Sequence, residues 1–303
     1  MNKDEFTNKE FMLNVGDGHE ISVVDWGNID AKTPIIFLHG GPGGNIKDAF
    51  KVPFNPKVQR VIFFDQRGCG KSTPLGSRQN NTIEKLADDI TKIAKHLKIG
   101  QFYLNGYSWG STLALYYAIT RPEMVVGLAI GGVYNGSKEM DQVFRANAET
   151  FYPDIWDKVL TDTPIEHHND PISYHQDKAL NGTKAEQKKS AYVMDCLEGA
   201  LCSPDDRKLP ESFDEYDPAG SQIEIDYVAS NCFMPKNFLL NNVHKIKVPV
   251  YIVQGRFDMV CPPNFAYEIS KIIPNAKLYW AISNHSPEHE ITQIFRAIFD
   301  SLG

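Results

Sequence analysis

One serine in this chain of 303 residues has the surroundings of a catalytic nucleophile. Ser108 is the centre of a G-x-S-x-G pattern at residues 106–110, between the apolar segment QFYLN and the helical segment STLALYYAIT. A strand, a sharp turn and a helix in this order expose such a serine at the edge of a sheet. Glycine two positions before and after the serine avoids collisions between the strand and the helix. We therefore expect Ser108 to be a nucleophile.

A serine nucleophile needs a general base, and the base needs an acid that orients it. Asp258 follows the apolar segment VPVYIVQG at 248–255, and His285 follows the next such segment, KLYWAI at 277–282. Catalytic groups collect at the ends of parallel strands, which favours Asp258 as the acid and His285 as the base. A loop or helix-capping aspartate is the alternative for Asp258. His289 competes for the role of base, but we expect it inside the following helix.

Acyl transfer also needs two N–H donors for the developing oxyanion. One is predicted to be the backbone N–H of Trp109, directly after the nucleophile. The segment HGGPGG at 39–44 follows an early predicted strand and supplies the second, for which we choose Gly41, with Gly40 as the alternative. A phosphate-binding loop is disfavoured because the sequence lacks G-x-x-x-x-G-K-[ST]. We expect His39 to form structural hydrogen bonds rather than to act as a base.

Short apolar runs alternate with helical patterns on both sides of a more polar middle segment. They predict buried strands at 34–38, 60–64, 101–105, 125–130, 248–255 and 277–282. Asn81, with Glu84 three residues later, is expected to begin an amphipathic helix. The middle segment favours a mainly helical insertion. The prediction is an α/β core domain over 1–132 and 246–303, with a mostly parallel central sheet flanked by helices, and a helical cap domain over 133–245.

The composition is that of a folded protein with an acidic surface. It has 31 Lys plus Arg against 38 Asp plus Glu, a net charge of -7, and no dense basic run, so we expect no binding to nucleic acid or to a membrane. The charged first residues are unlike a secretory signal, and no apolar run reaches about 18 residues, which favours a cytoplasmic location. Five cysteines without C-x-x-C spacing favour free thiols, and we expect no metal or other cofactor.

Four motifs together resemble the prolyl iminopeptidase (proline aminopeptidase) family of α/β-hydrolases. They are HGGPGG at 39–44, DQRGCGKSTP at 65–74, GYSWGS at 106–111 and GRFDMVCP at 255–262. The second motif is much more specific to this family than the G-x-S-x-G pattern, which many hydrolases share. The resemblance implies the α/β-hydrolase fold and a serine peptidase. Such an enzyme releases an N-terminal proline, or a similar residue, from peptides without a metal or cofactor.

Two stretches of the predicted cap resemble substrate-binding segments of the same family. Leu197-Glu198-Gly199-Ala200 is similar to a W-E-G-A stretch, and Ile223-Glu224 with Tyr227 is similar to an I-E-x-x-Y stretch. The resemblance implies that Glu198 and Glu224 bind the free α-amine of the substrate, and it places Tyr227 among the substrate-binding residues. Carboxylates suit an ammonium group because they offset its desolvation and accept its hydrogen bonds. Surface glutamates or members of ion pairs are the alternative for both.

Aromatic residues of the cap are candidates for the wall of a proline pocket. The segment Phe151-Tyr152-Pro153-Asp154 resembles an F-P-D segment of the family. By that register Phe144 falls near the wall, and Tyr134 is another candidate. A flat ring suits a pyrrolidine because it offers apolar contact and leaves no polar group unpaired. Packing within the cap is the alternative for both residues.

The predicted function is a serine exopeptidase that forms an acyl-enzyme on Ser108. Its partners are short peptides with a free N-terminal proline or a small residue such as alanine, because Met194 and Leu197 stand where the family tends to have tryptophan. The alternatives are an esterase or amidase of the same fold that acts on small acyl substrates without a free amine, and a ligand-binding protein without catalysis. The sequence leaves open whether the protein is a monomer or a small homo-oligomer. It also leaves open whether the thiol of Cys261 is reactive or is buried and inert.

Overall fold

The computed structural model describes residues 4–137, 140–202, 216–286 and 289–302, and all elements named below lie within them. The strands are β1 (Thr7–Gly16), β2 (His19–Gly27), β3 (Ile35–Leu38), β4 (Arg60–Phe64), β5 (Phe102–Tyr107), β6 (Val125–Gly131), β7 (Val250–Gly255) and β8 (Ala276–Ala281). The α-helices are α1 (Ile83–His96), α2 (Trp109–Thr120), α3 (Met140–Phe151), α4 (Pro153–Thr161), α5 (Pro171–Asn181), α6 (Lys184–Cys202), α7 (Ala219–Ala229), α8 (Phe238–Asn242), α9 (Pro263–Ile272) and α10 (His289–Ser301). Short 3₁₀ helices are η1 (Asp48–Lys51), η2 (Pro122–Met124), η3 (Ile165–His167), η5 (Asn231–Phe233) and η6 (Val243–Lys245). No helix in the described ranges is long and apolar enough to cross a membrane.

The eight strands form one sheet in the order β1-β2-β4-β3-β5-β6-β7-β8. β2 pairs antiparallel with β1 and β4, and all other neighbours are parallel. The six predicted strands are confirmed as β3 to β8, which form the parallel part of the sheet. The apolar pattern does not predict β1 and β2. Most side chains of β1 are not buried, and β2 carries several polar residues, so neither has a continuous apolar run.

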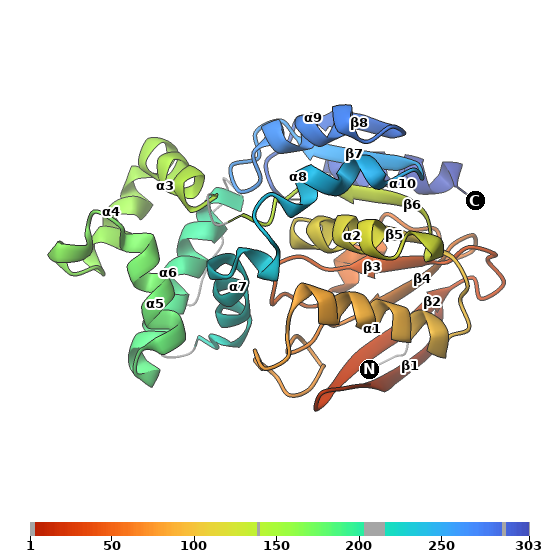
Figure 1. The fold of residues 1–303 in the computed structure, drawn as a ribbon, viewed down its shortest axis with the longest axis horizontal. Coiled ribbons are helices and arrows are strands. Elements are labelled where there is room, and N and C mark those ends of the chain that lie inside the picture. The colour runs from red at the N-terminus through yellow and green to blue at the C-terminus, as the bar shows by residue number, and fades with distance from the viewer. Residues whose placement is uncertain (1–3, 138–139, 203–215, 287–288, 303) are drawn as a thin grey trace.

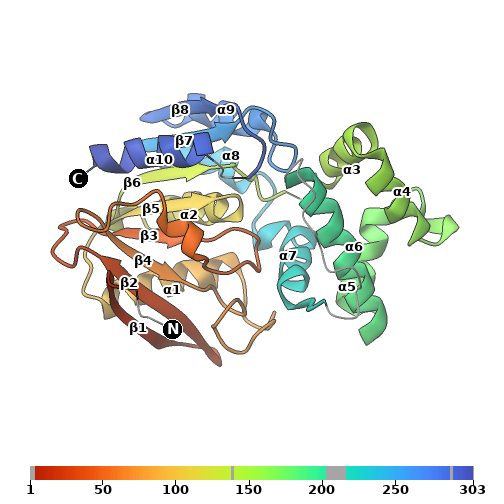
Figure 2. The same ribbon diagram turned by 180° about the vertical axis from the view of Figure 1, so that it is seen from behind.

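Helices cover both faces of the sheet, and the side chains of each strand alternate between two cores. On β3, Ile36 and Leu38 belong to a cluster shared with α1, α2 and α9, whereas Ile35 and Phe37 belong to a cluster shared with α10. Figures 1 and 2 show α1 and α2 on one face and α10 on the other. Burial of each such side chain stabilises the fold by about 1.5–3 kcal/mol. The sheet is therefore a rigid platform for the loops at its edge.

A set of helices lies beyond one end of the sheet. In both views α3, α4, α5 and α6 stand apart from the sheet, and α7 lies between them and the strands (Figures 1 and 2). Their own apolar cluster includes Trp156, Ile172 and Leu197. These helices confirm the mainly helical character predicted for the inserted segment.

The chain packs against the sheet again earlier than the predicted boundary at residue 245. Cys232, Met234, Leu239 and Val243 belong to the same apolar cluster as the sheet and α2. The division into core and cap stays a proposal, and this packing, which Ile223 and Tyr227 of α7 share, favours a second boundary before residue 245. The sequence pattern does not mark this point because these residues come from short helical turns rather than from a buried strand.

Helix α7 joins the cap to the core by close contacts. Tyr227 Oη donates a hydrogen bond to Asn81 Oδ1 at 3.0 Å. The ring of Tyr227 meets the ring of Trp109 edge to face, with a centroid distance of 4.8 Å. Near its N-terminus, α7 lies so close to the glycine-rich loop that a Cβ on Gly43 would be 2.1 Å from the carbonyl oxygen of Gly220. The core therefore determines where α7 places its side chains.

The N-cap of helix α1 lies one residue later than the predicted start at Asn81. Thr82 is its N-cap, and Thr82 Oγ1 accepts a hydrogen bond from the N–H of Lys85. The predicted cap at Asn81 is wrong, because Asn81 uses its Oδ1, the atom that would cap the helix, to accept a hydrogen bond from Tyr227 Oη at 3.0 Å. Its Nδ2 donates to the carbonyl oxygens of Arg67 and Ser77 at 2.9 and 3.0 Å.

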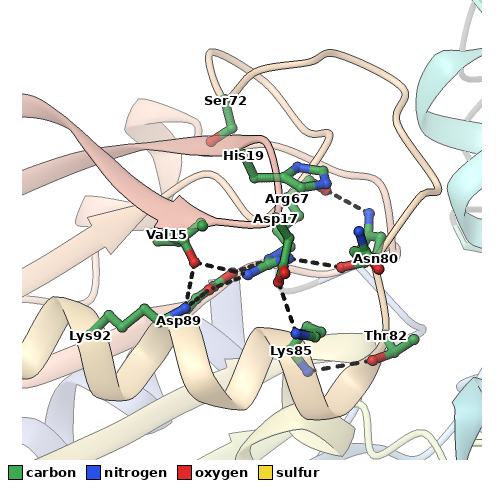
Figure 3. A network of polar contacts seen from close by, with 12 residues as sticks. Val15, Asp17, His19, Arg67, Ser72, Asn80, Thr82, Lys85, Asp89 and Lys92 are labelled. Carbon is green, nitrogen blue, oxygen red and sulfur yellow. Dashed lines mark hydrogen bonds and ion pairs between the residues drawn. The ribbon is translucent and has the colours of Figure 1, made fainter.

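A buried cation anchors the loop between β4 and α1 (Figure 3). The side chain of Arg67 has no exposed surface, and its Nε and Nη2 donate to the two carboxylate oxygens of Asp89 at 2.6 and 2.8 Å. Nη1 donates to Asn80 O and to Asp17 at 2.8 and 3.1 Å. A buried charge is tolerated only when it is paired and hydrogen-bonded in this way. The loop is thereby tied to α1 and to the turn between β1 and β2.

Neutralising this buried carboxylate should cost more stability than neutralising an exposed one. Asp89→Asn leaves the charge of Arg67 buried without its partner, and we expect the free energy of unfolding to fall by about 3–5 kcal/mol. The control is Asp88→Asn, the neighbouring residue on α1, whose pair with Arg121 is partly exposed. We expect that change to cost about 0–1 kcal/mol. Urea unfolding of both variants measures the difference, and equal losses would contradict a special role for the Arg67 pair.

Candidate active site

Ser108 lies on a strained turn between β5 and α2. Its backbone has φ +56° and ψ −128°, in a region that residues with side chains rarely adopt. A Cβ on Gly106 would lie 2.2 Å from the carbonyl oxygen of Gly110, and a Cβ on Gly110 would lie 2.1 Å from that of Leu38. Neither glycine position has room for a side chain, as predicted. The turn fixes the serine at the carboxyl edge of the parallel strands.

His285 and Asp258 meet Ser108 in a chain of hydrogen bonds. His285 Nε2 lies 3.0 Å from Ser108 Oγ, and His285 Nδ1 lies 2.8 and 3.0 Å from the carboxylate oxygens of Asp258. A proton on Nδ1 satisfies the carboxylate and leaves the lone pair of Nε2 to accept from the serine hydroxyl. The structure thus brings together the predicted nucleophile, base and acid, in a geometry that lets the imidazole take the serine proton.

The carboxylate of Asp258 is held by three further hydrogen bonds. Its Oδ1 accepts from the backbone N–H groups of Val260 and Cys261 at 3.0 and 2.7 Å, and its Oδ2 accepts from Gln254 Nε2 at 3.1 Å. Gln254 has no exposed surface, and its Oε1 accepts from the N–H of Val133. The sequence does not identify Gln254, whose position four residues before Asp258 is the only available signal. These bonds keep the acid oriented toward His285.

The glycine-rich loop after β3 runs beside the nucleophile. A Cβ on Gly40 would lie 3.3 Å from Ser108 Cβ, and Gly41 lines a cavity together with Ser108. Trp109 is the first residue of α2, and the first N–H groups of a helix have no acceptor within the helix. His39 forms structural hydrogen bonds, as expected, and burial lowers its pKa. Both predicted oxyanion donors therefore come from segments next to Ser108.

Two cavities share Ser108 on their walls. The inner cavity has a volume of about 70 Å³ and lies between the core and the cap. The outer one has a volume of about 500 Å³ and also includes His285 and Gly44. The residues common to both are Gly41, Pro42, Ser108, Asp195, Glu198, Ser221 and Glu224. Ser108 thus borders both a narrow and a wide space, and the two spaces share part of their walls.

Three carboxylates line both cavities. Glu198 and Glu224 are the predicted pair, and Asp195 is a third that the sequence interpretation missed. Asp195 stands three residues before Glu198 on α6, and this spacing on one helix face is a signal that could have found it. Burial raises the pKa of Glu224 well above its usual range, and the nearby carboxylates of Glu198 and Asp195 raise it further. Among the described lining residues of the inner cavity none is basic, so the site favours a cation.

Phe144 and Tyr134 reach the inner cavity, whereas Tyr227 does not. Phe144 and Tyr134 line it together with apolar residues of the cap, namely Met194, Ile225 and Val228. Tyr227 is 1% exposed and packs against Trp109 and Asn81 beneath α7. The resemblance implies that Tyr227 contacts the substrate, but the neighbouring residue Val228 lines the cavity instead. Tyr227 therefore positions α7 and lies outside the substrate space.

Cys261 also lines the inner cavity, but its thiol is poorly suited to react. It is 1% exposed, and burial raises its pKa well above the usual value. Because the thiolate is the reactive form, this favours the buried, inert alternative. All five cysteines are free, as expected.

The chain has clear relatives in sequence. Residues 33–285 match the family model described as the alpha/beta hydrolase fold. The chain is 36% identical over 273 residues to a probable proline iminopeptidase of Leptolyngbya boryana, a match that covers 88% of this chain and 85% of that protein. It is 35% identical over 283 residues to a proline iminopeptidase of Arabidopsis thaliana, covering 88% and 72%.

Solved structures share the fold at lower identity. The crystal structure of a proline iminopeptidase from Mycobacterium smegmatis matches with a TM-score of 0.63 and 19% identity over 97% of each chain. An esterase from Exiguobacterium antarcticum matches with a TM-score of 0.62 and 19% identity, over 97% of this chain and 99% of that one. These structures confirm the predicted fold class. The sequence relatives show that this chain belongs to the proline iminopeptidase family of α/β-hydrolases.

Proposed function

We propose that this protein is a serine aminopeptidase that releases an N-terminal proline, or a small residue such as alanine, from short peptides. The observation that carries the proposal is the inner cavity, where Glu198 and Glu224 line the same narrow space as Ser108. A substrate carbonyl held at Ser108 brings its own α-amine into this space. The names of the relatives support the same activity.

The proposed first step is the transfer of the acyl group to Ser108. Ser108 Oγ attacks the carbonyl carbon of the first residue while its proton passes to His285 Nε2. The N–H groups of Trp109 and Gly41 stabilise the oxyanion that forms. The C–N bond then breaks, and His285 donates the proton to the departing amine. Asp258 stabilises the imidazolium meanwhile.

The second step returns the enzyme to its starting state. A water molecule gives a proton to His285 and attacks the ester on Ser108. The new tetrahedral intermediate is stabilised by the same N–H donors. It collapses as His285 returns the proton to Ser108 Oγ, which releases the free amino acid. The chemistry uses no cofactor.

The cavities suggest how substrates are selected. The inner space holds one residue, whose ammonium group meets Glu198 and Glu224 and whose side chain meets the apolar wall at Phe144 and Tyr134. The wide outer cavity takes the rest of the peptide. Small or cyclic side chains suit the inner volume, which supports proline and alanine as N-terminal residues. We propose a cytoplasmic location, where free cysteines stay reduced.

Removing the nucleophile should abolish turnover without unfolding the protein. We expect Ser108→Ala to lower kcat by a factor on the order of 10⁶, because the remaining groups cannot form the acyl-enzyme. Hydrolysis of Pro-p-nitroanilide and of p-nitrophenyl acetate measures the effect, with circular dichroism as the check on folding. Substantial activity in the folded variant would contradict the assignment of Ser108.

Neutralising the amine-binding carboxylates should affect substrates with a free amine selectively. We expect Glu198→Gln and Glu224→Gln to lower kcat/KM for Pro- and Ala-p-nitroanilide by about 10- to 100-fold, because each removes a negative charge that would pair with the ammonium group of the substrate. Turnover of p-nitrophenyl acetate should change little. The matched control is Asp226→Asn on α7, since Asp226 lines neither cavity.

A second set of substrates separates this function from its alternative. The wild-type protein should cleave Pro-p-nitroanilide and leave N-acetyl-Pro-p-nitroanilide intact. Hydrolysis of the ester alone, with no cleavage of Pro-, Ala- or Leu-p-nitroanilide, would favour an esterase that acts on small acyl groups without a free amine. Equal losses on anilides and esters in the glutamate variants would count against amine binding by Glu198 and Glu224.

Amine recognition should depend on pH through Glu224. Its pKa is raised by burial and by the carboxylates nearby, so Glu224 is neutral at low pH and gains its charge only above its usual range. We expect the ratio of kcat/KM for Ala-p-nitroanilide to that for p-nitrophenyl acetate to rise with pH, and to fall again as the substrate amine loses its proton near pH of about 8. Ionisation of His285 affects the turnover of both substrates equally, so its effect cancels in the ratio. In Glu224→Gln the rising limb should disappear, and its persistence would assign that limb to another group.

A further inference from the structure

The DQRGCGKSTP motif at 65–74 has no role in the chemistry described so far. It follows β4 directly, at the same edge of the sheet as Ser108. Arg67 of this motif is held by Asp89 and anchors the loop (Figure 3). Gln66 stands between that anchored residue and the end of β4. Its side chain is 1% exposed, so each of its polar atoms must find a partner in the protein.

The side chain of Gln66 joins the two segments that carry the proposed oxyanion donors. Its Oε1 accepts a hydrogen bond from the indole Nε1 of Trp109 at 2.9 Å. Its Nε2 donates to the carbonyl oxygen of His39 at 3.0 Å. An indole N–H can only donate and a carbonyl oxygen can only accept, so the orientation of the amide is determined by its partners.

The main chain of Gln66 acts on the same loop through the ring of His39. The N–H of Gln66 donates to His39 Nε2 at 3.0 Å, which places the proton of the neutral imidazole on Nδ1. Nδ1 lies 2.9 Å from the carbonyl oxygen of Gly40 and donates to it. In a trans peptide the C=O of Gly40 and the N–H of Gly41 point in opposite directions. Holding that carbonyl therefore aims the N–H of Gly41.

We propose that Gln66 is the positioning residue of the oxyanion hole, whose amide sets the spacing between the N–H of Trp109 and the N–H of Gly41. The proposal rests on the serine hydrolase chemistry proposed above. Donors to an oxyanion act through their exact placement, since they must match the position of the charge in the transition state. A displacement of about 1 Å can cost 10²-fold in rate. Gln66 touches no substrate atom and acts only through Trp109 and His39.

The chain provides a matched control at the other end of β4. Gln59 precedes this strand and Gln66 follows it, so the two glutamines lie at opposite edges of the sheet. Gln59 is 7% exposed, and its Nε2 donates to the carbonyl oxygen of Phe299. Gln59→Met and Gln66→Met each remove a buried amide, one just before β4 and one just after it. Only the second change lies beside the proposed oxyanion hole.

The test compares kcat and KM of both variants on p-nitrophenyl acetate, an ester that needs no amine recognition. We expect Gln66→Met to lower kcat by about 10- to 100-fold with KM within threefold of the wild type. Gln59→Met should keep kcat within twofold while losing a similar amount of thermal stability. If Gln66→Met does not fold, Gln66→Glu serves in its place, because it keeps an acceptor for Trp109 and loses the donor to His39.

A thiono ester supplies a second measurement, which would not change if Gln66 had only a structural role. Replacing the carbonyl oxygen by sulfur puts the developing charge on a larger atom that accepts hydrogen bonds poorly. We expect the ratio of kcat/KM for p-nitrophenyl acetate to that for p-nitrophenyl thionoacetate to fall at least fivefold in the Gln66 variant and to stay unchanged in Gln59→Met. An unchanged ratio, or equal losses of kcat in the two variants, would overturn the proposal.

The ester also separates this proposal from the aminopeptidase assignment. If the wild type hydrolyses esters but no aminoacyl anilide, the peptidase function fails while the role of Gln66 can still be measured. If anilides are cleaved and the Gln66 variant behaves like Gln59→Met, the peptidase function stands and the role of Gln66 is wrong.

Discussion

The site depends on the left-handed backbone of one residue, Ser108. Residues with side chains avoid this conformation at a cost of about 1–3 kcal/mol, so the surrounding structure must impose it. β5 enters the turn from the middle of the sheet, and α2 leaves it packed against β3, with Gly106 and Gly110 in contact. The turn exposes the hydroxyl and directs the start of α2 toward the same point. The nucleophile and one proposed oxyanion donor are therefore positioned by a single backbone feature.

The two ends of the proposed substrate meet opposite electrostatic environments. The carbonyl end faces backbone N–H groups and the start of a helix, which favour negative charge. The amine end faces Asp195, Glu198 and Glu224, which repel one another in a partly buried space. Without a cation, burial and the neighbouring carboxylates raise the pKa of Glu224 and so favour its protonated form. An incoming ammonium group favours the ionised form of Glu224. In the proposed function, substrate binding and ionisation of Glu224 are therefore coupled.

Core and cap contribute different halves of this arrangement, and the loop after β4 contacts both. Asn81, at the end of this loop, accepts the hydrogen bond of Tyr227 and so holds α7, which carries Glu224. Gln66, at its beginning, bonds to Trp109 and His39 beside the nucleophile. Arg67 stabilises the segment between them with a fully paired, buried charge. One anchored loop thus contacts both the segment after Ser108 and the helix that carries Glu224, a proposed amine-binding residue.

The sequence by itself predicted the parallel strands, which the structure confirms. It also named Ser108, Asp258 and His285, which the structure brings within hydrogen-bond distance, and Glu198 and Glu224, which line one cavity. Each of these follows from a local pattern: an apolar run, a glycine spacing or a short motif. The local pattern failed where contacts between distant segments decide the outcome. Asn81 does not cap α1 because its Oδ1 accepts a hydrogen bond from Tyr227 instead. Tyr227 leaves the substrate space because Trp109 and Asn81 hold it. Only the tertiary structure brings Asp195 to the cavity, Gln254 to Asp258 and Gln66 to Trp109, because hydrogen bonding and burial depend on distances in space.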